Sequence, residues 1–177
     1  MYMNLDDHIR KVQDFPKEGI LFYDITGVLM NPQALQYCIN EAVARYSLAE
    51  HKVDAIAAIE ARGFIFAAPV AAALGLPLIV IRKKGKLPGP VYSALYDLEY
   101  GQAEIEVHIS DIPSGKKILL FDDLIATGGT LKAARTLIAD YGKAHVTEIF
   151  GIIGLPFLHY EQLLSPTPVK TLIQYYK

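Results

Sequence analysis

The residues best suited to chemistry form one uninterrupted string at positions 118–130, Ile-Leu-Leu-Phe-Asp-Asp-Leu-Ile-Ala-Thr-Gly-Gly-Thr. An apolar run leads to two carboxylates, and a short loop then leads to a glycine pair. Gly128 and Gly129 permit backbone conformations, and a close approach of a ligand, that any side chain would block. The amides of residues 126–130 can therefore point at a phosphate, aided by the positive end of a following helix.

Polar groups around this loop complete a site for a phosphorylated ribose. The hydroxyls of Thr127 and Thr130 and the amide of Ala126 can donate hydrogen bonds to a phosphate without adding charge. Asp122 and Asp123 stand just upstream, where carboxylates can accept hydrogen bonds from two ribose hydroxyls. They can also help to hold a hydrated Mg²⁺ indirectly, while the phosphates of the substrate carry the ion.

Two other nucleotide-binding motifs are missing from this string. A Walker A loop requires a lysine after the glycines, and none follows them here. The dinucleotide fingerprint Gly-x-Gly-x-x-Gly is also absent. The remaining alternative is an ordinary strand, turn and helix with a solvated acidic pair. A lone Gly-Gly would favour that alternative, but the whole string favours the ribose site.

Two further segments place positive charge where a polyanion could bind. Residues 60–64 follow a predicted strand and precede a predicted helix, and the guanidinium fork of Arg62 matches the oxygens of a phosphate. Residues 81–90, which include Lys83 and Lys86, form the densest positive cluster in the chain. Such a cluster can concentrate a polyanionic substrate at one edge of the protein. Taken alone, residues 60–64 could simply carry an exposed arginine, and residues 81–90 could be a solvated loop.

The helices and strands that must position these residues can be predicted from the spacing of apolar residues and from the residues that begin or end such elements. Asn31 and Pro32 are typical of an N-cap and a first helical position. Residues 83–102, rich in Lys, Gly, Pro and Tyr, indicate a long loop or a mobile hairpin. The segment 103–109 alternates Glu with Ile and Val, which predicts a strand with one exposed face. We expect helices at 32–47, 64–74 and 129–141 and strands at 54–59, 78–82, 103–109, 117–121, 145–153 and 170–175.

Strands that alternate with helices predict an α/β fold with a mainly parallel twisted sheet flanked by helices. Ligands of such sheets bind beyond the carboxyl ends of the strands, so the acidic pair and the basic loops should meet at one edge. A length of 177 residues fits a single domain over 1–177.

Composition narrows the class of protein. A hydrophobic fraction of 52% and a charged fraction of 20% predict a folded chain. The net charge of −2 argues against a nucleic-acid binder with a broadly basic surface. The single cysteine, Cys38, excludes an internal disulfide, fits a reducing compartment, and lies in an apolar stripe typical of a buried thiol.

One segment requires a test for a membrane span. Residues 63–81 carry no charge and are long enough to cross a bilayer. Gly75 and Pro77 divide the segment into a helix-like and a strand-like piece, which favours a buried helix followed by a buried strand. The N-terminus shows no signal peptide. We therefore expect a cytoplasmic protein without a membrane segment.

The string at 118–130 resembles the 5-phosphoribosyl-1-pyrophosphate motif of the type I phosphoribosyltransferases, in the form used by the adenine branch of that family. Residues 14–26 resemble the adenine-recognition segment of the same branch, within an N-terminal region of about residues 1–30. The resemblance implies that Leu21 and Phe22 offer the purine an apolar face. It also implies that Leu155 faces the purine opposite Leu21. The resemblance also places Tyr23 in the adenine site, although Tyr23 departs from the pattern, because the family usually carries arginine there.

The basic segments resemble other parts of the family. Residues 60–64 are similar to its pyrophosphate loop, which implies that Glu60, Ala61 and Arg62 bind pyrophosphate. In the family, the peptide at the position of Glu60–Ala61 tends to be cis. The segment 81–90 is similar to the family's basic loop, in which Arg82, Lys83 and Lys86 would approach the pyrophosphate.

Residues 96–101 resemble the end of the family's mobile catalytic loop. The resemblance implies that Glu99 handles the purine proton, that Tyr100 and Tyr96 close the site, and that Arg62 joins Glu99 and Tyr100 among the catalytic residues. The fold implied is the type I fold, with a small N-terminal hood and a mobile loop. A homodimer is also implied.

The reaction implied is transfer of 5-phosphoribosyl from 5-phosphoribosyl-1-pyrophosphate to N9 of adenine, which gives AMP and pyrophosphate in purine salvage, with Mg²⁺. One alternative is an enzyme for another base, which residues 14–26 and 96–101 argue against. The other is a non-enzymatic regulator that senses the activated ribose. The short, slightly acidic chain has no room for the nucleic-acid module that such a regulator would need.

Overall fold

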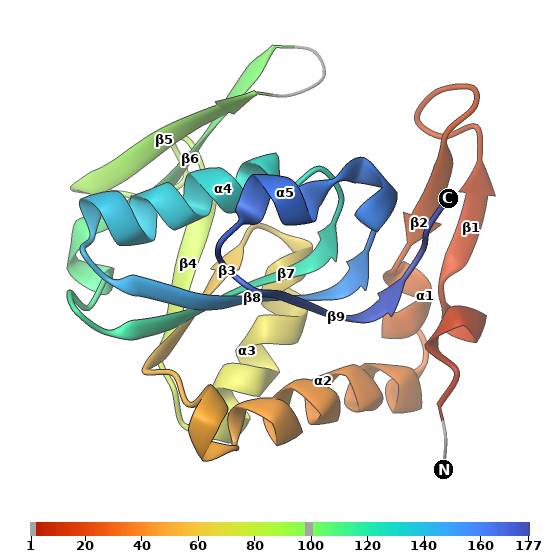
Figure 1. Ribbon diagram of the computed structural model, residues 1–177, viewed down its shortest axis with the longest axis horizontal. Coiled ribbons are helices and arrows are strands. Elements are labelled where there is room, and N and C mark those ends of the chain that lie inside the picture. The colour runs from red at the N-terminus through yellow and green to blue at the C-terminus, as the bar shows by residue number, and fades with distance from the viewer. Residues whose placement is uncertain (1–2, 98–100) are drawn as a thin grey trace.

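A twisted sheet forms the centre of the protein in the computed structural model, which describes residues 3–97 and 101–177 (Figure 1). Within those residues the sheet has seven strands in the order β5-β6-β4-β3-β7-β8-β9. Four neighbouring pairs, β4–β3, β3–β7, β7–β8 and β8–β9, are parallel, and β6 pairs antiparallel with both β4 and β5. The strands are β3 (Ala55–Ile59), β4 (Leu78–Lys83), β5 (Val91–Asp97), β6 (Gln102–His108), β7 (Lys117–Ile125), β8 (His145–Gly154) and β9 (Val169–Gln174). The predicted mainly parallel sheet is confirmed.

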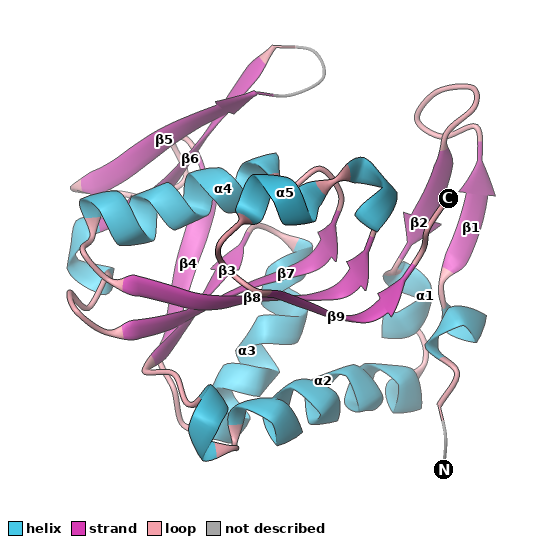
Figure 2. Cartoon of the chain, in the orientation of Figure 1, coloured by secondary structure: helices cyan, strands magenta, loops and turns pink. Residues whose placement is uncertain are grey.

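Helices cover both faces of the sheet, as Figure 2 shows. One layer contains α2 (Pro32–Tyr46) and α3 (Arg62–Leu74), and the opposite layer contains α4 (Gly129–Thr136), the π-helical segment η4 (Leu137–Tyr141) and α5 (Tyr160–Leu164). Successive side chains of a strand point to opposite faces, so β7 contributes to two cores. Leu119 and Phe121 belong to the cluster of α2 and α3, whereas Ile118 and Leu120 belong to that of α4 and α5. Cys38 lies buried in the first cluster, as expected.

A small antiparallel hairpin near the N-terminus forms the predicted hood. It consists of β1 (Arg10–Gln13) and β2 (Leu21–Asp24), and Figure 1 shows it beside the C-terminal segment that follows β9. The sequence did not predict these two strands, because β1 is exposed along its whole length and shows no alternation of apolar and polar residues. Short helical elements complete the chain at η1 (Leu5–His8), α1 (Thr26–Leu29), η2 (Ala49–His51), η3 (Ile109–Asp111) and η5 (Pro156–Leu158).

Local signals placed most element boundaries correctly. The side chain of Asn31 caps α2 by accepting hydrogen bonds from the amides of Gln33 and Ala34, each at 3.0 Å. The 83–102 segment contains β5, which pairs antiparallel with β6, and residues 98–100 lie outside the described residues. The charge-free segment at 63–81 is divided between α3 and β4. In the described chain, no helix is both long and apolar enough to cross a membrane.

Two boundaries differ from expectation by more than one residue. The strand predicted to end at Phe121 continues to Ile125, because Asp122 pairs with Gly151 and Leu124 with Ile153 on the longer neighbour β8. The acidic pair is therefore part of the strand and is held by its ladder. The helix predicted to start at 64 begins two residues earlier.

Candidate active site

The functional residues gather at the carboxyl ends of the parallel strands. A cavity of about 390 Å³ opens there. It is lined by the loop after β3, the end of β4, the acidic end of β7 and parts of the β5–β6 hairpin. The lining residues are Ile59, Glu60, Ala61, Arg62, Ile81, Arg82, Lys83, Tyr96, Ile105, Asp122, Asp123, Leu124 and Thr130. The structure thus brings the predicted ribose carboxylates and all of the predicted pyrophosphate residues except Lys86 into the lining of one cavity.

A smaller cavity of about 100 Å³ lies in the loop after β7. Residues 124–131 and Asp122 form its walls, and it shares Asp122, Leu124 and Thr130 with the larger cavity. Gly128 has φ of +83°, and a Cβ there would lie 3.2 Å from the Cβ of Tyr160. The loop reaches this tight turn only with glycine, and the first residues of α4, Gly129 to Leu131, line the small cavity.

The acidic pair lies directly beside the start of α3. Arg62 Nε is 2.6 Å from Asp123 Oδ2, an ion pair in which the Asp123 side chain is 6% exposed. Apart from this ionic contact, Oδ2 accepts no hydrogen bond within the described residues. A Cβ on Gly63 would lie 3.0 Å from Asp122 Oδ1, which explains why a glycine follows Arg62.

The charges of Asp122 and Asp123 favour binding of a ligand that carries hydroxyl groups or positive charge. Burial, and then the charge of Asp123, raise the pKa of Asp122 well above its usual range, and Arg62 opposes this only in part. Asp122 Oδ1 also accepts a hydrogen bond of 2.9 Å from the amide of Asp123. Two adjacent carboxylates favour a ligand that supplies hydroxyl donors or positive charge, because either relieves their repulsion.

A second ion pair positions the basic segment. Arg82 forms a two-point contact with Glu60, with Nε to Oε2 at 3.2 Å and Nη2 to Oε1 at 3.3 Å. The amide of Lys83 donates to the same carboxylate at 3.0 Å. These hydrogen bonds, from Arg82 first and then from Lys83, lower the pKa of Glu60. Glu60 was expected to bind pyrophosphate, and in the structure its carboxylate holds Arg82 beside the cavity.

Glu106 is a site residue that sequence reasoning missed. The alternation along 103–109 predicted that both of its glutamates are exposed, and that prediction is wrong for Glu106, which is 4% exposed. The basic loop folds over this face of β6, and Glu106 Oε1 accepts the amides of Lys86 at 2.8 Å and Leu87 at 2.7 Å. Burial pushes the pKa of Glu106 upward, but hydrogen bonds from the loop amides outweigh burial and leave it lowered. A buried glutamate in an alternating strand gives no local signal.

The predicted adenine residues lie apart from this cavity. Leu21 and Tyr23 share one face of β2, whereas Phe22 points to the other and packs edge-on against Phe15 at a centroid distance of 5.0 Å. Leu155 is buried, and Leu21 packs against the same cluster. None of the four is among the residues that line the 390 Å³ cavity. The structure therefore does not assemble Leu21 and Phe22 as one apolar face.

The remaining predicted residues divide into two groups. Glu99 and Tyr100 lie outside the described residues, whereas Tyr96 lines the cavity. The Glu60–Ala61 peptide is cis, as the family resemblance implied. Lys86 joins the site through its backbone, since its carbonyl accepts Nη1 of Arg82 at 3.3 Å. No cluster of three or more His, Cys, Asp or Glu side chains suited to a metal occurs in the described chain.

Known proteins resemble this chain along nearly its full length. Residues 26–150 match the family model of the phosphoribosyl transferase domain. The adenine phosphoribosyltransferase of Treponema denticola is 61% identical over 97% of this chain and 88% of its own length. That of Borrelia garinii subsp. bavariensis is 45% identical over 96% and 95% of the two chains.

Solved structures agree with the sequence comparison. Adenine phosphoribosyltransferase from Thermoanaerobacter pseudethanolicus superposes with a TM-score of 0.90 at 38% identity, covering 97% of this chain and all of its own. The enzyme from Saccharomyces cerevisiae, solved with adenine and an imino-altritol bisphosphate, gives a TM-score of 0.89 at 36% identity over 96% of each chain.

Proposed function

Because this chain belongs to the phosphoribosyltransferase family, we propose that it transfers the 5-phosphoribosyl group of 5-phosphoribosyl-1-pyrophosphate to adenine, which yields AMP and pyrophosphate in purine salvage. Relatives named for this activity cover nearly the whole chain. One structural observation supports this division of the substrate: the glycine-loop cavity and the Arg62–Arg82 cavity adjoin, because Asp122, Leu124 and Thr130 line both. A sugar bridging them would bind its 5-phosphate in one and its pyrophosphate in the other.

The two cavities determine the orientation of the substrate. The 5-phosphate lies in the small cavity against the amides of residues 126–130 and the hydroxyls of Thr127 and Thr130. The ribose hydroxyls donate to Asp122 and Asp123. The pyrophosphate meets Arg62, Arg82 and the basic loop, where positive charge stabilises the leaving group as the C1–O bond breaks.

Arg62 must exchange partners when the substrate binds. In the structure it pairs with Asp123 Oδ2 at 2.6 Å, and its side chain is 41% exposed. A pyrophosphate group offers more charge than one carboxylate, and it draws the guanidinium away. Asp123 Oδ2 is then free to accept a ribose hydroxyl. Arg62 thus links occupation of the pyrophosphate site to formation of the ribose site.

The base enters from the hood side of the sheet. Leu21 and Leu155 provide the apolar contacts to the purine, and the backbone of residues 21–23 reads its edge. As N9 of adenine bonds to C1 of the ribose, its proton must leave, and the carboxylate of Glu99 receives it. Tyr96, which lines the cavity, helps to exclude water, and the family resemblance implies the same role for Tyr100.

The chain fits a magnesium ion that the substrate brings with it. Mg²⁺ is usually bound by one or two carboxylates together with phosphate oxygens and water, and Asp122 and Asp123 offer such a pair. When bound, the ion would neutralise negative charge on the pyrophosphate.

The test is formation of AMP and pyrophosphate by the purified chain, with Mg²⁺ and with each of adenine, hypoxanthine, guanine, xanthine and orotate. We expect AMP from adenine and no nucleotide from the other bases. Turnover of another base alone would contradict the adenine assignment and leave the family assignment standing. Excess EDTA should abolish turnover, and unchanged turnover would contradict the role of magnesium.

We further propose that the enzyme is a cytoplasmic homodimer, as the family resemblance implies. Sedimentation equilibrium at the concentration of the activity assay should give the mass of two chains. A mass of one chain under conditions of full activity would contradict the dimer. Activity in the membrane fraction of lysed cells, instead of the supernatant, would contradict the location.

A further inference from the structure

The ring of Tyr175, just after β9, is held by both strands of the hood. It stacks on Tyr23 of β2 with a centroid distance of 4.0 Å and an interplanar angle of 18°. Lys11 of β1 places its Nζ atom 5.3 Å from the centroid of the Tyr175 ring. Lys11 and Tyr23 are opposite each other in the register of the hairpin, so Tyr175 contacts one cross-strand pair.

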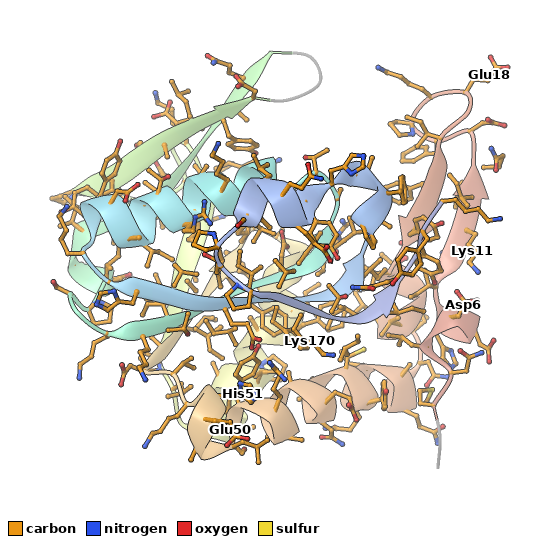
Figure 3. The ribbon with its side chains drawn as sticks, viewed as in Figure 1. Asp6, Lys11, Glu18, Glu50, His51 and Lys170 are labelled. Atoms are coloured by element: carbon orange, nitrogen blue, oxygen red, sulfur yellow. The ribbon has the colours of Figure 1, made fainter. Side chains whose placement is uncertain are left out.

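Hydrogen bonds of the two tyrosine hydroxyls hold the stacked rings in place. The hydroxyl of Tyr175 donates to Asp6 Oδ1, and Lys11 Nζ lies 2.8 Å from Asp6 Oδ2. Figure 3 labels Asp6 and Lys11 on the side of the molecule where β1 and the C-terminal segment lie. The hydroxyl of Tyr23 donates to the backbone oxygen of Lys177 at 2.7 Å. Each ring is therefore fixed both by stacking and by a hydrogen bond.

The backbone of Tyr175 links the hood to the end of β8. Its amide donates to the carbonyl of Gly154 at 3.0 Å, at the carboxyl end of β8. The next residue, Leu155, donates its amide to the carbonyl of Ile125 at 2.9 Å, directly before the phosphate loop. A continuous path therefore runs from the phosphate loop through Leu155 and Tyr175 to Tyr23.

We propose that Tyr175, together with Tyr23, is a positioning residue for the base, which fixes the separation between Leu21 and Leu155 across the adenine site. This rests on the proposed function, in which the purine lies between those two leucines. Leu21 is two residues from Tyr23 on the same face of β2, and Leu155 is adjacent to Gly154. Tyr175 touches neither adenine nor the sugar, so it acts only through the hairpin.

The same contacts give Tyr23 a role. Its side chain is 3% exposed, does not line the 390 Å³ cavity, and is engaged by the Tyr175 ring and the backbone oxygen of Lys177. A tyrosine at this position and a tyrosine at 175 form a complementary pair. Tyr23 therefore contributes to the base site through its backbone in β2 and through the stacking of its ring on Tyr175.

The test separates the two substrates kinetically. We expect Tyr175→Ala to raise KM for adenine by about tenfold, from the loss of a stacked pair and a hydrogen bond to a carboxylate. KM for 5-phosphoribosyl-1-pyrophosphate should stay within about twofold, because the phosphate loop keeps its own glycine turn. Tyr175→Phe retains the stacking and should give a smaller rise, and it serves where the alanine variant does not fold.

Tyr176→Ala is the matched control, since Tyr176 is the adjacent tyrosine and is 71% exposed. It should change neither KM. An unchanged adenine KM in both Tyr175 variants, or equal rises in the two KM values, would overturn the inference while the wild-type enzyme still forms AMP. Failure of the wild-type enzyme to use adenine would instead overturn the proposed function, and this inference with it.

Discussion

Replacing Glu106 by alanine should weaken binding of the activated sugar and leave binding of adenine unchanged. Glu106 Oε1 accepts two backbone amides, from Lys86 and Leu87, and no other side chain is hydrogen-bonded to either amide in the described residues. The loop it holds also supplies the carbonyl that orients Arg82. Without the carboxylate, Arg82 keeps Glu60 but loses a fixed loop behind it.

The size of the effect follows from these contacts. A hydrogen bond to a charged group contributes about 1.5–3 kcal/mol. Water can replace part of this at the edge of the protein, so the two bonds together should stabilise the binding-competent loop by about 2 kcal/mol. Since 1.4 kcal/mol corresponds to a tenfold change in an equilibrium constant, we expect KM for 5-phosphoribosyl-1-pyrophosphate to rise by about 30-fold.

The assay is initial-rate kinetics with each substrate varied in turn. Glu106→Gln keeps an acceptor oxygen and should recover most of the affinity, which a role of charge alone would not allow. Glu104→Ala is the matched control on the same strand, because Glu104 pairs only with the exposed Lys84 among described side chains. Equal KM values for the activated sugar in Glu106→Ala and the wild type would refute the reasoning.

Two stability predictions follow from the carboxylates. Asp122→Asn should raise the melting temperature at pH 7 and have little effect near pH 3. The pKa of Asp122 is raised in the folded state, so the native state binds more protons than the unfolded state. The wild-type protein therefore loses stability as pH rises above the pKa of Asp122 in the unfolded state. Thermal unfolding at both pH values measures this, and a lower melting temperature at pH 7 would contradict it. Glu148→Gln should destabilise by about 2 kcal/mol at pH 7, because Glu148 accepts Arg45 Nη2 at 2.5 Å and the Tyr46 hydroxyl at 2.6 Å. Burial raises the pKa of Glu148, but those partners lower it overall, so the stabilisation is present above its ordinary pKa and is lost as pH falls through the lowered value. Urea unfolding at pH 7 and pH 3 should show the difference shrink, and a constant difference would contradict it.

Much of the fold could be predicted from the sequence because its signals are local. Asn31 and Pro32 mark the start of α2 through a cap and a fixed φ angle, and both operate within one turn. The tight turn after β7 was equally predictable, since Gly128 and Gly129 are a local signal that follows the acidic pair after one short loop. The continuous apolar run before Asp122 indicated a strand buried on both faces, and the structure confirms it.

The parts that escaped prediction depend on contacts between distant segments. Glu106 looked like an exposed strand residue because the loop that buries it comes from residues 86–87, about twenty positions earlier. Tyr23 could not be placed because its partner, Tyr175, lies at the other end of the chain. The extension of β7 past Phe121 required the length of β8, which no local pattern in β7 encodes.

We propose that the acidic pair at the end of β7 binds the ribose. The most direct measurement is the rate of AMP formation by the Asp122→Asn, Asp123→Asn double variant beside the wild type, with circular dichroism of both. We predict loss of turnover in a variant that retains the wild-type spectrum, because neither amide can accept the ribose hydroxyls as a carboxylate does. Normal turnover by the folded double variant would contradict the claim.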